Sequence, residues 1–262
     1  MFLVEMRNIW KNFGHVTALR GVDFVVGTNE VVGLIGDNGA GKSTLIKILT
    51  GVFPPTKGEM YIKGEKIDWR HYSVREAHKM GIETVFQEQA LALKQPLWRN
   101  IFISRQPTNF LGFIKVKQAK TQTEKLLRSF IGFTGVGIDP ETTVRTLSGG
   151  ERQGVAIARA LYFQADLVVM DEPTTALSLQ ESAKVLEFIS KIKEYGKSCV
   201  YISHNIADVY SVSDRFVILD RGKVVAEFKR EEISRSQLIE RLLAYRERGR
   251  LGKSDSGNEV KK

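Results

Sequence analysis

The stretch Gly36-Asp37-Asn38-Gly39-Ala40-Gly41-Lys42-Ser43-Thr44 decides the fold of this chain, because it fits the phosphate-binding pattern G-x-x-x-x-G-K-[ST] without a mismatch. The apolar run 30–35 before it is typical of a buried strand, and apolar residues recur at helical spacing over 42–49. A strand, a glycine loop and a helix let backbone N–H groups surround a polyphosphate at the helix N-terminus. The alternative is an ordinary glycine-rich turn, which the agreement between pattern and flanks disfavours.

Residues 36–44, here called the phosphate loop, include two side chains with predicted roles. Lys42 is expected to place its charge on the outer phosphates, and Ser43 is expected to place its hydroxyl on Mg²⁺. The glycines let the main chain approach the phosphates closely. The predicted binding residues of the loop are Gly36, Asn38, Gly39, Ala40, Gly41, Lys42, Ser43 and Thr44.

Composition sets outer bounds on what the chain can be. Its 262 residues, of which 42% are hydrophobic, suffice for one large domain, or one domain with an insertion. No apolar stretch reaches the length of a membrane span, and the first residues lack a secretory pattern, so a cytosolic location is expected. The net charge of +9 suits phosphates, an anionic membrane or nucleic acid. No dense basic block with interleaved aromatics favours nucleic acid over a solvated basic face.

Strand and helix patterns alternate along most of the chain. Residues 90–146 differ, because they show helical patterns separated by loose loops, and we interpret them as a helical insert. The alternation on either side predicts an α/β fold with a mainly parallel central sheet. The polar segment 246–262 lacks periodicity and is expected to be a disordered tail.

The second motif is the apolar run 167–170 followed by Asp171 and Glu172. Ligands of open parallel sheets gather at the carboxyl ends of the strands, where these two acids would lie. Asp171 is expected to hold Mg²⁺, and Glu172 to polarise an attacking water. An apolar run that simply ends in two acids is the alternative, which the phosphate loop elsewhere in the chain disfavours.

The third motif is the turn Ser148-Gly149-Gly150 before a helix predicted over 151–162. A serine and bare glycine N–H groups at a helix start form a second candidate anion site. On spacing alone, a plain N-cap with a turn is the preferred interpretation of this motif.

Together, in this order and spacing, the three motifs resemble the nucleotide-binding subunit of ATP-binding-cassette transporters. The resemblance extends to about residue 245. It implies a P-loop NTPase (RecA-like) core with an N-terminal antiparallel β subdomain, formed by 1–89 and 147–245, and a helical subdomain over 90–146.

Three further residues gain a role only through this resemblance. Gln87 matches the glutamine that links the Mg²⁺ site to the helical subdomain, and His204 matches the histidine that contacts the γ-phosphate. Phe13 matches the aromatic residue that stacks on adenine. From composition alone they would be a surface glutamine, a structural histidine and a core phenylalanine.

The resemblance also implies a mechanism. ATP and Mg²⁺ on one phosphate loop are capped by Ser148, Gly149 and Gly150 of a second subunit in an ATP-dependent homodimer. Lys42 and His204 stabilise charge while Glu172 activates water. The cycle drives a separate membrane permease from the cytoplasmic face of the membrane.

Two positions depart from the family pattern. Glu151 stands where glutamine is usual, and a carboxylate in the first turn of a helix is acceptable. Ser178 stands where aspartate is usual. With Glu181 it forms the capping pattern S-x-x-E, so the helix start is preserved while a charge is lost.

Within the family, runs 81–87 and 147–160 are similar to those of ribose, xylose and fructose importers. This implies a single-cassette ATPase for a monosaccharide, supplied by an extracytoplasmic sugar-binding protein and without a nucleic-acid partner. The alternatives are the ATPase of an exporter, a soluble non-transport factor, and a subunit that binds ATP without turnover.

Overall fold

The computed structural model describes residues 2–85, 91–130, 138–175 and 177–254. A six-stranded sheet forms the centre of the fold, with strand order β10-β9-β3-β8-β7-β6. Its pairs are parallel, except that β10 runs antiparallel to β9. The strands are β3 (Val31–Ile35), β6 (Ile82–Val85), β7 (Leu167–Asp171), β8 (Ser198–Ile202), β9 (Arg215–Asp220) and β10 (Lys223–Lys229). The expected α/β fold is confirmed.

Both faces of this sheet are covered, which is why its inner strands are continuous apolar runs. Every residue of β3 and β8 is buried. Alternate side chains enter two cores: Val32 and Leu34 join the core beneath the N-terminal sheet, whereas Val31 and Ile35 join the core beneath the later helices. The parallel strands therefore all direct their carboxyl ends to one edge of the molecule.

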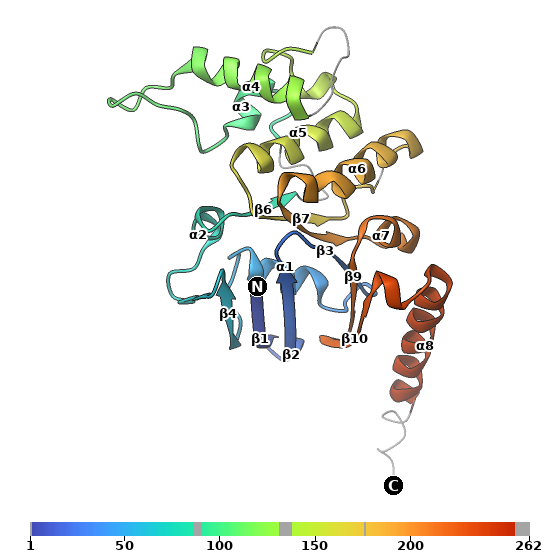
Figure 1. The fold of residues 1–262 in the computed structure, drawn as a ribbon. Helices are drawn as coiled ribbons and strands as arrows, with labels where there is room; N and C mark the ends of the chain where they lie inside the picture. The colour runs from blue at the N-terminus through green and yellow to red at the C-terminus, as the bar shows by residue number, and fades with distance from the viewer. Residues whose placement is uncertain (1, 86–90, 131–137, 176, 255–262) are drawn as a thin grey trace.

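A second, antiparallel sheet packs beside the first (Figure 1). Its strand order is β2-β1-β4-β5, and the two long strands β1 and β2 pair along their whole length. The strands are β1 (Phe2–Phe13), β2 (Val16–Gly27), β4 (Lys57–Ile62) and β5 (Glu65–Lys66). The resemblance implied this N-terminal antiparallel subdomain, and the structure has it.

Helices fill the remaining layers. In the central part, α1 and α2 follow the first strands, and α5, α6 and α7 cover one face of the large sheet (Figure 1). The α-helices are α1 (Lys42–Leu49), α2 (Val74–Lys79), α3 (Leu97–Ile101), α4 (Val116–Phe130), α5 (Gly149–Tyr162), α6 (Leu179–Lys191), α7 (Ile206–Val212) and α8 (Arg235–Ser254); the 3₁₀ turns are η1 (Val144–Thr146), η2 (Ile192–Tyr195) and η3 (Arg230–Glu232). Among the described residues, none of the helices combines the length and hydrophobicity that a bilayer span requires.

Helices α3, α4 and α5 form the helical region with a core of its own. Trp98 and Ile101 of α3, with the C-cap residue Phe102, pack against Leu126 of α4 and Val155 of α5. This agrees with a helical insert over 90–146, although α5, which follows that range, completes the core.

The expected disorder over 246–262 is wrong for its first part, because α8 continues to Ser254. Six of the nine residues over 246–254 are arginine, glutamate, leucine or lysine, which are good helix formers, and they outnumber Gly249 and Gly252. Residues 255–262 lie outside the described residues.

Candidate functional site

The phosphate loop leaves β3 at the carboxyl edge of the sheet and is tightly enclosed. A Cβ atom at Gly36 would lie 2.2 Å from the carbonyl oxygen of Leu219, so no larger residue fits there. Gly41 has φ +108°, and a Cβ there would lie 2.8 Å from Leu19 Cδ2. The glycines at positions 36 and 41 thus each have a local steric cause.

Neighbouring strands hold the loop by its backbone. Gly222, in the turn between β9 and β10, donates its N–H to the carbonyl of Ala40 at 2.8 Å. The carbonyl of Gly222 in turn accepts the N–H of Arg20 on β2, also at 2.8 Å. Asn38 and Gly39 lie at the exposed tip of the loop, and Gly39 has φ +82°.

Lys42 begins α1 and folds back over the loop. Its Nζ donates to the carbonyl of Gly36 at 2.6 Å and to that of Asp37 at 3.1 Å, and the residue is 7% exposed. An ammonium fixed by two carbonyls on the inside of a glycine loop is poised beside any phosphate that enters it.

The first turn of α1 is open to a ligand. Gly41 occupies the N-cap and has no side chain that accepts a hydrogen bond, so the helix dipole and N–H groups face the loop. Ser43 in this turn is exposed, and Thr44 is half-buried. The sequence-predicted residues 36–44 therefore share one cradle.

Asp171 and Glu172 end β7 at the same edge. Burial raises the pKa of Asp171, and the charge of Glu172 raises it further. The positive charges of Lys42, Lys47 and His204 oppose this rise. Glu172 adopts φ +51°, a conformation that costs about 1–3 kcal/mol for a residue with a side chain.

His204 follows β8, the neighbour of β7, and contacts Glu172. Its Nε2 lies 2.5 Å from Oε1 of Glu172, and the Glu172 N–H donates to the carbonyl of Ile202 at 2.9 Å. Asn205 then caps α7 by accepting the N–H of Ala207 at 3.0 Å, which fixes the chain on the far side of the histidine.

The strand order explains how residues far apart in sequence meet. β3, β8 and β7 are consecutive in the sheet, so Lys42, His204 and the pair Asp171–Glu172 arrive at adjacent carboxyl ends. Gln87 follows the next strand, β6, and lies outside the described residues.

The oxygen ligands available at this edge fit Mg²⁺. Ser43 offers a hydroxyl and Asp171 a carboxylate, which are hard ligands of the kind that Mg²⁺ selects. Among the described residues no group of three or more His, Cys, Asp or Glu could enclose a metal. A magnesium ion here would therefore depend on phosphate oxygens and water for its remaining ligands.

The second candidate anion site, at the start of α5, is closed by a capping box. Glu151 donates its N–H to Ser148 Oγ at 3.2 Å, and Ser148 donates its N–H to Glu151 Oε2 at 2.7 Å. The preferred interpretation from spacing alone, an N-cap, is confirmed. Glu151, where the family has glutamine, is the partner residue of that cap.

Glu181 of α6 also reaches the start of α5. Its Oε1 accepts the Gly150 N–H at 2.9 Å, while Oε2 accepts the Ser178 N–H at 3.0 Å. These hydrogen bonds, with the Gly150 N–H first, lower the pKa of Glu181 to about 2. A Cβ at Gly150 would lie 2.8 Å from Cβ and Cγ of Glu181, so the glycine permits this contact.

Phe13 ends β1, pairs with Val16 of β2 and is 47% exposed. Its ring meets Phe53 edge-on, with centroids 5.5 Å apart. Since Ala18 and Leu19 on β2 touch Gly41, Phe13 lies at the end of the antiparallel sheet that abuts the phosphate loop. The aromatic ring is thus exposed rather than part of the core.

Sequence reasoning named Glu151 and Glu181 but not the contacts that they make at the start of α5. The capping role of Glu151 was readable from the pattern S-x-x-E at 148–151. The contact between Glu181 and Gly150 joins residues 31 positions apart, and no local pattern could have revealed it.

Comparisons with known proteins agree with this geometry. Residues 19–175 match the family model described as ABC transporter. The chain is 42% identical to a xylose/arabinose import ATP-binding protein of Sulfolobus acidocaldarius, over 98% of both chains. It is 35% identical to a ribose import ATP-binding protein of Caldanaerobacter subterraneus, over 92% of this chain and 47% of that one. The chain thus spans about half the length of that ribose relative.

Solved structures give the same picture. A nucleotide-free ATP-binding cassette of an ABC transporter superposes with a TM-score of 0.75 at 26% identity, covering 93% of this chain and 96% of that one. A dimeric cassette in a post-hydrolysis state, bound to ADP and Pi, superposes with a TM-score of 0.72 at 27% identity, covering 88% and 100%. The chain belongs to the ABC transporter family, as one of its ATP-binding cassettes.

Proposed function

We propose that the chain is the ATP-hydrolysing subunit of an importer for a monosaccharide. It would act at the cytoplasmic face of the membrane, as an ATP-dependent homodimer beneath a separate permease. The names of the relatives above, which import xylose, arabinose or ribose, support this substrate class. An extracytoplasmic sugar-binding protein would then deliver the sugar to the permease.

The edge formed by β3, β8 and β7 supplies the groups that hydrolysis of ATP needs. The phosphate loop holds the β- and γ-phosphates with its N–H groups and with Lys42. Ser43 and Asp171 would hold Mg²⁺, which neutralises phosphate charge when bound, with Gln87 as the predicted link to the helical region. Phe13 would stack on the adenine ring.

Glu172 and His204 act on the attacking water and the γ-phosphate. The Glu172 carboxylate accepts a proton from water, or orients it, as the oxygen attacks in line. His204, 2.5 Å from Glu172, fixes that carboxylate and offers an N–H to the developing negative charge. Their contact across two adjacent strands is the observation that best supports hydrolysis rather than binding alone.

The start of α5 would complete the site of the second subunit. Ser148, Gly149 and Gly150 are proposed to cap the γ-phosphate of ATP bound to the partner. Residues of both subunits would therefore form each ATP site. The dimeric cassette with ADP and Pi, to which this chain is similar, supports such an assembly.

Substitution of Glu172 by glutamine tests the hydrolytic role. We expect Glu172→Gln to lower the ATP turnover rate by about 10²–10⁴-fold, because a neutral amide cannot accept the proton. ATP binding should remain, and the dimer should accumulate in size-exclusion chromatography. Glu187→Gln, an exposed glutamate of α6 paired with Lys191, is the matched control. Equal turnover in both variants would contradict the role of Glu172.

The substrate class needs a transport measurement. Vesicles reconstituted with this subunit, its permease and binding protein should accumulate labelled xylose, arabinose or ribose when ATP is supplied. Accumulation should cease with the Glu172→Gln variant. Active turnover in solution with no uptake of any pentose or hexose would contradict sugar import and leave the ATPase assignment intact.

A further inference from the structure

A protruding hairpin between α3 and α4 has no role in the proposed function. Residues 106–115, here called the aromatic hairpin, extend away from the body of the molecule (Figure 1). Thr108 and Ile114 form an antiparallel bridge across it, and Lys115 donates its N–H to the carbonyl of Pro107 at 2.7 Å. The segment is a loop, as expected between helical patterns, and it has its own hydrogen-bonded frame.

Asn109 builds the tip of this hairpin. Its Oδ1 accepts the N–H of Leu111 at 3.0 Å and that of Phe113 at 2.9 Å. Its own N–H donates to the carbonyl of Phe113 at 2.9 Å, and its carbonyl accepts the N–H of Gly112 at 3.0 Å. Two hydrogen bonds to the Asn109 side chain and two to its backbone fix the turn, so little conformational entropy is left to lose when the tip binds a partner.

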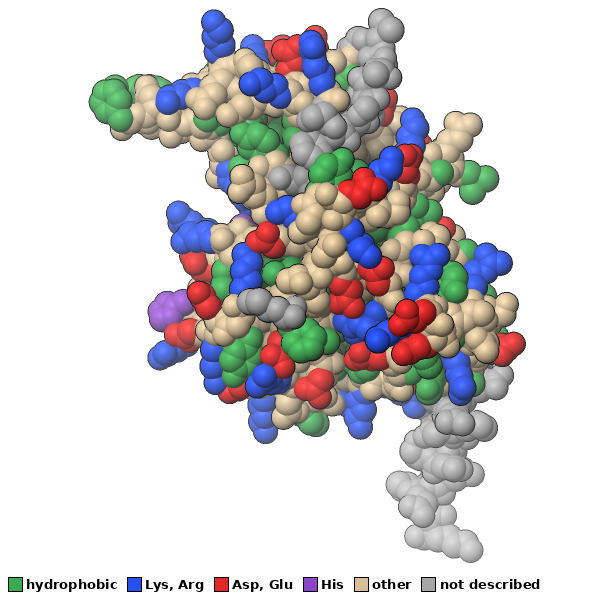
Figure 2. Space-filling view, viewed as in Figure 1, with side chains coloured by type: hydrophobic (Ala, Val, Ile, Leu, Met, Phe, Trp, Pro, Cys, Tyr) green, Lys and Arg blue, Asp and Glu red, His purple; other side chains and the backbone are tan. Residues whose placement is uncertain are grey.

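The rigid tip presents apolar side chains to solvent. Phe110 is 94% exposed, Phe113 69% and Leu111 64%. In Figure 2 they form a green cluster at the end of the protrusion, apart from the rest of the surface. Large apolar side chains gathered in one exposed place are the unusual observation in a folded protein, and they mark a surface that meets an apolar partner.

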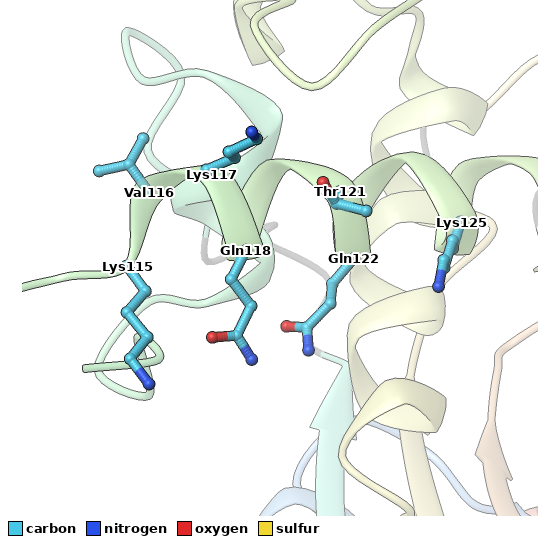
Figure 3. A pocket seen from close by; sticks show the side chains of 7 residues that line it. All are labelled: Lys115, Val116, Lys117, Gln118, Thr121, Gln122 and Lys125. Atoms are coloured by element: carbon cyan, nitrogen blue, oxygen red, sulfur yellow. The ribbon is translucent and has the colours of Figure 1, made fainter. Parts of the chain in front are cut away.

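The surroundings of the tip are basic. Between residues 89 and 123 the chain has no aspartate or glutamate. The same stretch contains Lys94, Arg99, Arg105, Lys115, Lys117 and Lys120. Lys115 and Lys117 lie at the root of the hairpin and line a shallow groove along α4 with Gln118, Gln122 and Lys125. Figure 3 shows Lys115, Gln118, Gln122 and Lys125 on the same side of that helix.

We propose that the aromatic hairpin is an anchor to an anionic membrane surface. Phe110, Leu111 and Phe113 enter the boundary between headgroups and acyl chains, while Lys115 and Lys117 meet the lipid phosphates. This goes beyond ATP hydrolysis and permease binding, because the contact is with lipid and requires neither nucleotide nor a second protein.

The composition of the hairpin favours lipid over a protein partner. Lysine is depleted at protein–protein interfaces, whereas lysine beside exposed phenylalanine and leucine is typical of segments that bind the membrane interface. A convex tip of three side chains also enters a bilayer without a preformed pocket. The base is firmly attached, since Arg105 pairs with Glu83 at 2.6 Å and stacks over the Phe163 ring at 4.4 Å.

Vesicle binding tests the anchor directly. The purified chain, without ATP, is sedimented with vesicles of phosphatidylglycerol and phosphatidylcholine in equal parts, and with vesicles of phosphatidylcholine alone. We expect binding to the anionic vesicles, and a loss of about tenfold or more in partition coefficient for Phe110→Ser/Phe113→Ser. Lys115→Gln/Lys117→Gln should lose about tenfold, and high salt should reproduce that loss.

Two controls keep the test specific. Leu179→Ser removes an apolar side chain that is 92% exposed at the start of α6, and it should leave vesicle binding unchanged. Phe113→Trp should show a blue shift of tryptophan fluorescence with anionic vesicles only. The tip side chains lie outside the core, so the serine variant should melt at the wild-type temperature.

Either of two results would overturn the anchor. One is equal sedimentation of the wild type with anionic and neutral vesicles, and the other is undiminished binding of the serine variant. Binding that requires a reconstituted permease and is lost in the serine variant would make the hairpin a protein contact instead. Because no arm of the test uses ATP, failure here is distinguishable from failure of the proposed hydrolysis.

Discussion

The N-termini of α1 and α5 are both helix starts rich in glycine, but the structure treats them differently. At α1, Gly41 leaves the N-cap without a side chain, and the Lys42 ammonium lies inside the phosphate loop. At α5, Ser148 and Glu151 cap each other, and Glu181 occupies the Gly150 N–H. One helix start is open to an anion, whereas the other already holds carboxylates of its own chain.

This difference matches the two proposed roles, which are primary ATP binding at α1 and capping of the partner's ATP at α5. An open site binds nucleotide on first encounter, since nothing has to leave it. In the proposed dimer, a site occupied by its own carboxylate would accept a partner's γ-phosphate only when Glu181 withdraws, so we expect binding across the dimer to be weaker than binding at α1. The sequence pattern shows the cap formed by Ser148 and Glu151, but not the contact of Glu181, because Glu181 comes from another helix.

The largest effect is expected from removing the cation of the open site. Lys42→Ala should weaken ATP binding by about 10- to 100-fold, because a charge-assisted contact to the phosphates is lost. Lys47→Ala, an exposed lysine on the same helix, is the matched control. The measurement is titration with a fluorescent ATP analogue. Similar affinity in the two variants would mean that α1 is not the primary site.

A smaller effect is expected from opening the closed site. Glu181→Gln removes the negative charge while its amide oxygen still accepts the Ser178 N–H. In a Glu172→Gln background we expect ATP-dependent dimerisation to tighten by about two- to fivefold, as measured by analytical ultracentrifugation. Glu187→Gln is again the control. A weaker dimer would show instead that Glu181 holds the Gly150 N–H in its binding position.

The smallest effect concerns how α5 is attached to the sheet. Burial raises the pKa of Glu83 on β6 to about 7, and the charge of Arg159 on α5 opposes the rise. Because the pKa of this carboxyl group is raised in the folded state, the free energy of unfolding of the protein falls as pH rises from the unfolded pKa, about 4.5, through about 7.

Denaturant unfolding of Glu83→Gln measures this loss. Between pH 4.5 and pH 8 the wild type should lose about 1–3 kcal/mol relative to the variant, which has no proton to release. If the difference in free energy of unfolding between the wild type and the variant does not change with pH, Arg105 and Arg159 keep Glu83 ionised throughout. An ion pair would then fix α5 at every pH.

Local sequence patterns were sufficient wherever one segment determines its own structure. The phosphate loop, the apolar strand before Asp171 and the S-x-x-E cap at Ser178 each have a local physical cause, and the structure has all three. The helix α7 was not predicted, because its seven residues between two strands show too little periodicity.

The features that local patterns did not predict depend mainly on contacts between distant segments. The 2.5 Å approach of His204 to Glu172 follows from the order of β7 and β8 in the sheet, which no local sequence pattern gives. The positive φ of Glu172 and the folded tip around Asn109 depend on specific hydrogen bonds that composition does not encode. The role of Gln87 stays a prediction.

The backbone ladder through Gly222 ties the two sheets to the floor of the phosphate loop. Ala40, Gly222 and Arg20 form one continuous chain of hydrogen bonds, and a Cβ at Gly222 would lie 2.5 Å from the carbonyl oxygen of Ala18. A side chain at position 222 would therefore wedge these layers apart and deform the loop from behind. Such a variant would lose nucleotide affinity because the support of the phosphate loop is deformed, although position 222 lies more than 170 residues after the loop in the sequence.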